Sequence, residues 1–230
     1  MKKVFVWSQK PNYGKNTITF NIATKISSKK QKSAIISSKL PEEIVELKRK
    51  NKIKCFDILE NNRHLVSFFL NPKRLLRLEM SQEEFKETII SDFNEIKKNT
   101  DFLFIESSNT NQSFNELMLF NSDDVILVYS ANEYASNQVL SDLALIRKAQ
   151  LKNNSLKISC VILNEYKKDK TEHINALMNL KKVFNTKIFV LPFNDNLNKE
   201  SKTAKVYLEK NPWSDFAIKI DEIVNIIVNN

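Results

Sequence analysis

The sequence predicts a doubly wound α/β fold, with a mostly parallel sheet flanked by helices. Its apolar residues gather in short continuous runs that do not alternate with polar ones, as is typical of parallel strands covered on both faces. Segments with helical periodicity separate these runs, and such an order favours right-handed crossovers and ligand binding beyond the carboxyl ends of the strands. The apolar runs are residues 4–7, 34–36, 102–105, 125–129, 158–163 and 188–191.

The helical segments are recognised by apolar residues three or four positions apart. The residues that carry this spacing are Ile18, Ile22 and Ile26 after the first run; Phe85, Ile89, Phe93 and Ile96 before the third; and Val139, Leu143 and Ile146 after the fourth. Residues 51–80 fit short helices or an edge strand about equally well. Because no linker, repeat or low-complexity tract interrupts the chain, we expect a single domain over residues 1–230.

The last segment, "SDFAIKIDEIVNIIVNN", places Phe216, Ile220, Ile223 and Ile227 on one helical face. An amphipathic membrane anchor and a helix packed on the sheet both fit this spacing. Membrane-surface helices carry Lys and Arg on the polar face. Here Lys219 is the basic residue among several acidic ones, so we expect the helix to pack on the sheet.

The composition indicates a soluble globular protein, with 42% hydrophobic and 27% charged residues. No apolar run approaches the roughly 18–20 residues that cross a bilayer, and the start of the chain does not resemble a signal peptide. We therefore expect no transmembrane segment and a cytoplasmic location. Cys55, Cys160, His64 and His173 lack the spacing of metal ligands, which argues against a Cys/His metal site.

The formal net charge of +9 raises the question of a polyanionic partner such as DNA, because basic surfaces attract phosphate without sequence recognition. Drift in an AT-rich genome also explains abundant Lys with almost no Gly, and scattered Lys side chains then form a solvated face. Two explanations of the charge therefore stay open. The protein binds DNA nonspecifically and associates with the nucleoid, or the charge only reflects the composition of the genome.

The stretch "SQKPNYGKNTITFNIA" contains Gly14, the only glycine in the sequence. It lies between a predicted strand and a helix expected to begin at about Lys15. In this context a glycine lets the backbone pass close to a phosphate, and a neighbouring lysine can reach the terminal phosphates. The general pattern G-x-x-x-x-G-K-[ST] is broken here, because Ser8 or a neighbour replaces its first glycine and Asn16 replaces its hydroxyl residue.

The segment "KPNYGKNT" resembles the deviant Walker A loop of the ParA/MinD family of P-loop ATPases, K-G-G-x-G-K-[ST]-[ST]. It keeps both lysines, the glycine between them and the last hydroxyl, Thr17. The resemblance implies a homodimer in which Lys10 reaches across to the partner's ATP. It also implies that Lys15, with Gly14 and Thr17, binds the phosphates of the chain's own ATP.

The resemblance extends over nearly the whole chain. "NTDFLFIESS" resembles the family's third strand, which implies that Glu106 lies near Mg²⁺ and belongs to the catalytic set with Lys10. "CVILNEY" is similar to the strand whose asparagine contacts adenine, which would be Asn164. "VLPFND" resembles the family's "iPyD" stretch and adds Pro192 to the nucleotide-binding residues. Asn16 would be the second ligand of Mg²⁺.

Several departures from the family pattern weaken the predicted chemistry. Pro11 and Asn12 replace two glycines, and Pro11 has no N–H to offer a phosphate. Asn16 is a poorer Mg²⁺ ligand than a hydroxyl. Ser37 and Lys39 stand where the family has an aspartate pair that helps to position water. Since phosphoryl transfer depends on positioning and charge stabilisation, we expect a degenerate member with weak or lost ATP binding and slow or no hydrolysis.

Three functions follow. The first is a nucleotide-dependent dimer that positions plasmid DNA, in partition, or a cell-surface machine, together with an adaptor or cargo protein. The second is a pseudo-ATPase scaffold or localising factor of a pilus, secretion or conjugation system. The third is an ATP-dependent enzyme similar to dethiobiotin synthetase. In that family one strand ends in "EG", which Glu106 would match, and a K-P pair follows the second strand, which "SKLP" would match.

Overall fold

The structure is a computed structural model that describes residues 1–11, 13–29, 31–36, 100–109, 112–134, 136–194, 197 and 211–229. Its centre is a six-stranded sheet in the order β2-β3-β1-β4-β5-β6, in which every pair of neighbours is parallel. The doubly wound parallel sheet predicted from the sequence is therefore confirmed. The strands are β1 Lys2–Trp7, β2 Ser33–Ile36, β3 Phe102–Glu106, β4 Asp124–Ser130, β5 Lys157–Tyr166 and β6 Ile188–Pro192.

Burial on both faces explains why the strand sequences are continuously apolar. Along β1, Val4 and Val6 face one hydrophobic cluster, whereas Phe5 and Trp7 face a second cluster on the other side. This alternation is the ordinary two-residue period of a strand. Because helices cover both faces of the sheet, polar residues are disfavoured at the positions that face either cluster.

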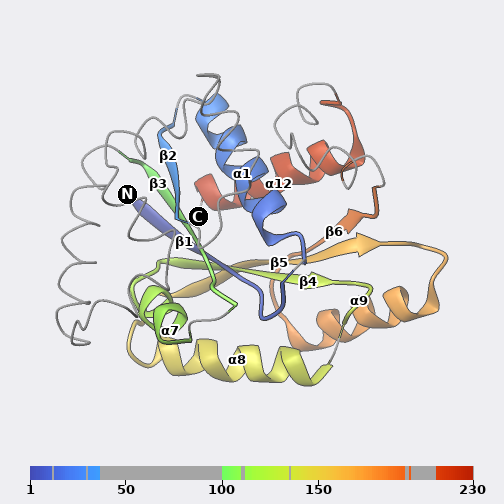
Figure 1. Ribbon diagram of the computed structural model, residues 1–230, viewed down its shortest axis with the longest axis horizontal. Helices are drawn as coiled ribbons and strands as arrows, with labels where there is room; N and C mark the ends of the chain where they lie inside the picture. Colours follow the sequence, from blue (N-terminus) through green and yellow to red (C-terminus); the bar gives the residue numbers. More distant parts are fainter. Residues whose placement is uncertain are drawn as a thin grey trace.

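The helices form two layers, one on each face of the sheet (Figure 1). Helices α1 and α12 lie on one face, and α7, α8 and α9 lie on the other. Their bounds are α1 Lys15–Ser28, α7 Gln112–Phe120, α8 Ser136–Gln150, α9 Thr171–Val183 and α12 Asp215–Asn229.

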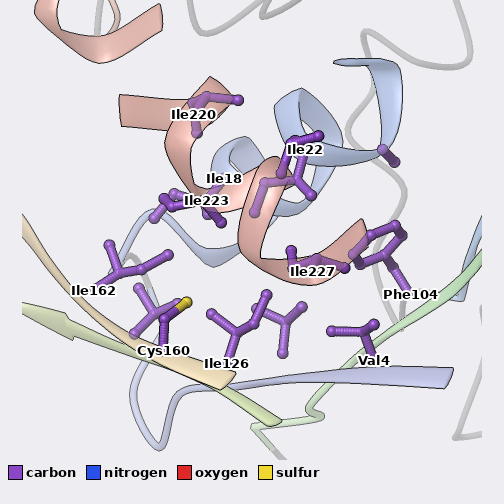
Figure 2. Close-up of a cluster of buried hydrophobic side chains, with 14 of the residues drawn as sticks. Val4, Ile18, Ile22, Phe104, Ile126, Cys160, Ile162, Ile220, Ile223 and Ile227 are labelled. Atoms are coloured by element: carbon purple, nitrogen blue, oxygen red, sulfur yellow. The ribbon is translucent and has the colours of Figure 1, made fainter. Parts of the chain in front are cut away.

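The last helix packs against α1 and the sheet, as its apolar spacing predicts. Figure 2 shows Ile220, Ile223 and Ile227 of α12 directed into the same cluster as side chains of α1 and the strands. All three isoleucines are fully buried. The apolar face of α12 is therefore part of the core, which excludes it as a membrane anchor in this conformation.

The sequence predicts α1, α8 and α12 but gives no clear signal for α7 and α9. In α9 the apolar positions are mixed with exposed Ile174 and Met178, so the helical period is blurred. The ambiguous interval 51–80 and the helix expected around Phe85, Ile89, Phe93 and Ile96 lie outside the described residues.

Lys2 ties the start of β1 to the end of α12. Its Nζ atom donates a hydrogen bond to the carbonyl oxygen of Ile227 at 2.7 Å and forms an ion pair with Asp124 at 2.7 Å. Lysine is favourable near the carbonyl end of a helix dipole, and Asp124 is fully buried, so its charge needs this partner. Both ends of the described chain are thereby held at the amino-terminal edge of the sheet.

No helix in the described part of the chain is both long enough and apolar enough to span a membrane.

We expect the Ile223→Ala substitution to lower the free energy of unfolding by about 2–5 kcal/mol, because it empties space in a fully buried core. Ile218→Ala, on the exposed side of the same helix with 44% exposure, is the matched control and should change it by under about 1 kcal/mol. Chemical denaturation monitored by circular dichroism measures both values. Equal losses would show that α12 is not packed as described.

Candidate functional site

A pocket of about 390 Å³ lies beyond the carboxyl ends of β1, β3, β5 and β6. This is where a doubly wound sheet with a topological switch at its central strand offers a ligand crevice. Every residue assigned to the site from the sequence lines this pocket: Lys10, Gly14, Lys15, Asn16, Thr17, Glu106, Asn164 and Pro192. The structure therefore brings together residues that are up to 182 positions apart in the chain, from Lys10 to Pro192.

Gly14 is required by two independent constraints. Its φ of +80° lies in the left-handed region that side chains disfavour. A Cβ atom added at this position would lie 2.3 Å from the Nδ2 atom of Asn164, far inside van der Waals contact. The single glycine of the chain is thus explained by the close passage of the loop beside β5.

Asn164 holds the loop from the other side. Its Nδ2 atom donates a hydrogen bond to the carbonyl oxygen of Tyr13 at 3.1 Å. The side chain of Tyr13 is itself buried, and its hydroxyl contacts the carbonyl oxygen of Glu133 at 3.0 Å and Gln138 Oε1 at 3.2 Å. The loop is consequently fixed to both β5 and the region that leads into α8.

Lys15 begins helix α1 and is only 7% exposed. Its ammonium group donates to the carbonyl oxygen and, at 3.0 Å, to the hydroxyl of Ser107, directly after β3. Burial lowers the pKa of Lys15 below its usual value, and the negative charge of Glu106 opposes this shift. An anion in the pocket would stabilise the charged form of this buried ammonium, because it compensates for the lost hydration.

The first turn of α1 also favours an anionic ligand. It contains no acidic residue, although a helix start is the position where negative charge is stabilised. Gly14 accepts the first helical hydrogen bond, from the N–H of Ile18 at 2.9 Å. The combination of Lys15, the helix start and a glycine-permitted turn is the arrangement that binds phosphate in many nucleotide-binding folds.

Lys10 lies at the mouth of the pocket and is about half exposed. Its Nζ atom is 3.6 Å from Glu133 of the same chain, in an ion pair whose two side chains are 49% and 56% exposed. Such exposed pairs contribute little free energy. Lys10 can therefore leave Glu133 at small cost for a stronger anion.

Glu106, the acidic residue that the resemblance assigns to Mg²⁺, is the last residue of β3 and is 2% exposed. It lines the pocket together with Asn16. Among the described residues, no group of three or more His, Cys, Asp and Glu side chains could hold a metal ion. A magnesium ion fits here only in the usual way for nucleotide sites, with one carboxylate and with phosphate oxygens as further ligands.

Of the other residues singled out from the sequence, Pro11 lines the pocket, whereas Cys160 and His173 do not. Cys160 is a free, buried cysteine in the core, and the Nδ1 atom of His173 accepts a hydrogen bond from the N–H of Lys167 at 2.9 Å. Asn12, Ser37, Lys39, Cys55 and His64 lie outside the described residues.

Sequence reasoning missed part of the pocket wall, namely Ile18, Asn109, Glu165, Phe193, Asn194, Leu197 and Phe216. Glu165 could have been predicted as a pocket residue, because it follows Asn164 directly where the apolar run of β5 ends. The others come from loops and helices whose position depends on tertiary packing.

A buried carboxylate also supports the end of β1 below the loop. Asp142 of α8 accepts hydrogen bonds from Trp7 Nε1 at 2.8 Å and from the Tyr129 hydroxyl at 3.0 Å, and it is 1% exposed. Burial raises the pKa of Asp142 to about 6, although both hydrogen bonds act in the opposite direction. Asp142 thereby links α8 to the strand that carries the phosphate loop.

No family model matches the sequence, and no curated protein matches it. Solved structures do match the fold. A plasmid partition protein from Borrelia burgdorferi has a TM-score of 0.68 at 17% identity, covering 99% of this chain and 98% of that chain. The MinD cell division protein of Aquifex aeolicus has a TM-score of 0.69 at 16% identity, covering 100% and 98%.

A third similar structure is the cobyrinic acid a,c-diamide synthase of Mycobacterium smegmatis with bound ATP analogue and magnesium. It has a TM-score of 0.61 at 14% identity, and the match covers 92% of this chain and 97% of that chain. Together with the six-stranded parallel sheet, these likenesses show that the chain has the α/β fold of P-loop NTPases.

The contact between Gly14 and Asn164 can be tested by a double-mutant cycle. Gly14→Ala should destabilise the protein by about 1–3 kcal/mol, because it combines an unfavourable φ with a steric clash. Asn164→Ala removes the clashing amide, so the double variant should be more stable than the sum of the single effects predicts. Thermal or urea unfolding measures the cycle, and strict additivity would contradict the contact.

Asp142 should make stability depend on pH. Its folded pKa of about 6 lies above the ordinary value of 3.8, so its contribution is complete below about pH 4 and is lost as the pH rises through 6. In Asp142→Asn this loss, up to about 3 kcal/mol, should be absent. The measurement is the difference in unfolding free energy between wild type and variant at pH 4.5 and pH 7.5. A difference that does not change with pH would contradict the assignment.

Proposed function

We propose that the chain binds a nucleoside triphosphate with Mg²⁺ in this pocket and acts as a ParA/MinD-like dimerising protein that positions DNA or a cell-surface machine. The observation that carries the proposal is the convergence of Lys10, Lys15, Glu106 and Asn164 around the Gly14 turn. The fold likeness to a plasmid partition protein and to MinD supports the positioning role.

The basic and acidic residues of the pocket have separate roles. Lys15 and the start of α1 hold the phosphates, and Lys10 is free to exchange its exposed Glu133 partner for a phosphate of a second copy's nucleotide. Glu106 and Asn16 hold Mg²⁺ with the phosphate oxygens. When bound, the magnesium ion neutralises charge on the phosphates and orients them.

Hydrolysis is proposed to be slow or lost. Pro11 lines the pocket without an N–H to donate, and Asn16 offers Mg²⁺ a neutral amide oxygen. Phosphoryl transfer obtains most of its acceleration from positioning and charge stabilisation, so each weakened contact lowers the rate. Binding tolerates such losses better than catalysis does, because fewer groups must be aligned at once.

A pseudo-ATPase scaffold of a pilus, secretion or conjugation system is the second candidate. The observation in its favour is Pro11 within the phosphate loop, where an N–H donor is lost. In this case the dimer would form without nucleotide. Nonspecific DNA binding, inferred from net charge, and a dethiobiotin synthetase-like activity stay predictions.

Nucleotide-dependent dimerisation tests the proposal. Light scattering coupled to gel filtration, with and without ATP and Mg²⁺, should show a monomer that becomes a dimer with nucleotide. Lys10→Ala should abolish the dimer while calorimetric ATP binding persists, because Lys10 acts across the interface. An ATPase assay on the same sample should give a rate several orders of magnitude below that of an efficient enzyme.

The matched control is Lys148→Ala on α8. Lys148 is 57% exposed and forms a similar ion pair with Glu116 at 3.8 Å, but it does not line the pocket. It should leave dimerisation unchanged. A dimer that ignores nucleotide favours the scaffold, and a chain that binds no nucleotide at all contradicts the proposal.

A further inference from the structure

The charges of the pocket give a bound nucleotide one orientation. Lys10 and Lys15 line the end at the phosphate loop, whereas Glu165 lies at the end formed by β5 and β6. A carboxylate repels phosphate unless a cation lies between them, as is proposed for Mg²⁺ at Glu106, so the phosphates belong at the lysine end. The opposite end also has apolar walls, from Pro192, Phe193, Leu197 and Phe216, which suit a flat heteroaromatic ring.

Glu165 reaches this pocket through an unusual backbone conformation. Its φ of +61° makes it the one described non-glycine residue in the left-handed region. Successive side chains of a strand point to opposite faces, yet Asn164 and Glu165 both line the pocket. The sheet register shifts between Leu163 and Tyr166, where this turn interrupts β5. Strained residues of this kind gather at ligand sites.

Two donors from β4 and the residues after it orient the carboxylate. The hydroxyl of Ser130 and the Nδ2 atom of Asn132 donate to Glu165 Oε2, at 2.7 and 3.1 Å. Ser130 is 2% exposed, so its hydroxyl is a fixed support and not a mobile surface group. With Oε2 occupied by these donors, Oε1 is the oxygen through which Glu165 can accept from a ligand.

Asn164 contributes a second acceptor beside Glu165. Its Nδ2 atom donates to the carbonyl oxygen of Tyr13, so the amide orientation is set and Oδ1 is its acceptor atom. The base end of the pocket thus presents an amide oxygen and a carboxylate oxygen. Two acceptors fit a ligand group with two N–H donors and repel a carbonyl oxygen.

We propose that Glu165 is a base-selecting residue, which accepts a hydrogen bond from the exocyclic amino group of adenine and excludes purines with a carbonyl at C6. Adenine carries an amino group at this carbon, whereas guanine and hypoxanthine carry an acceptor oxygen there and an N1–H donor on the neighbouring atom. The proposed selection therefore places the Glu165 carboxylate opposite C6 and not opposite N1. The inference rests on the proposed function, because it assumes that a nucleotide occupies the pocket, and it assigns the selection to this residue in addition to Asn164.

The test compares ADP with inosine diphosphate, which differ at the purine C6 substituent and share sugar and phosphates. Isothermal titration calorimetry with Mg²⁺ should show that the wild type binds ADP about 10-fold or more tightly than inosine diphosphate, because two acceptors that face each other in the pocket lose a hydrogen bond and repel. In Glu165→Gln, the Oε1 atom can still accept from Ser130, and Nε2 can donate to the carbonyl of hypoxanthine. The preference should fall to about 1 to 3-fold.

Glu172→Gln is the matched control, since Glu172 is an exposed carboxylate of α9 and does not line the pocket. It should keep the wild-type ratio. A wild type without preference, or a Glu165→Gln variant with an unchanged ratio, overturns base selection and leaves nucleotide binding intact. Binding of neither nucleotide overturns the proposed function and this inference together. If Glu165→Gln unfolds, Asn132→Ala takes its place, because it removes one donor that orients the Glu165 carboxylate and should lower the ratio.

Discussion

The loop after β1 passes so close to the end of β5 that no side chain fits between them, and the candidate site depends on this approach. The gap is set on one side by Gly14, whose φ is +80°, and on the other by the amide of Asn164, which is bonded to Tyr13. If the two segments moved apart, Lys15 would no longer share a pocket with Asn164. The single glycine of the sequence thus lies at a position where the backbone conformation and the steric contact both exclude other residues.

The surrounding framework explains how the loop can be held so firmly. Lys15 is bonded to Ser107 after β3, Tyr13 is anchored at Glu133 and Gln138, and Trp7 donates to buried Asp142. These contacts join the loop and its strand to the end of β3, to α8 and to the residues just before α8. The pocket is therefore organised before a ligand arrives, which lowers the entropic cost of binding. By contrast, exposed Lys10 is held by a weak ion pair and is the residue best able to move.

The fold and much of the site could be predicted because they depend on local patterns. Continuous apolar runs identified all six strands of the described sheet, because a parallel strand buried on both faces has no polar positions. Residues that follow such strands lie at one edge of the sheet, so Glu106 and Asn164 could be expected near the phosphate loop. The likeness to a plasmid partition protein and to MinD agrees with this architecture and, at 16–17% identity, concerns the fold.

By itself, the sequence determined the parallel sheet, the glycine turn, the lysine at the start of α1 and the amphipathic last helix. Each of these follows from residue type and spacing within one segment. Only the tertiary structure decided that Glu165 enters the pocket, because the turn at φ +61° is a backbone state that residue identity does not reveal. It also decided the burial of Asp142 and the pairing of Lys10 with Glu133. These depend on segments more than 100 residues apart, whose distance is set by packing.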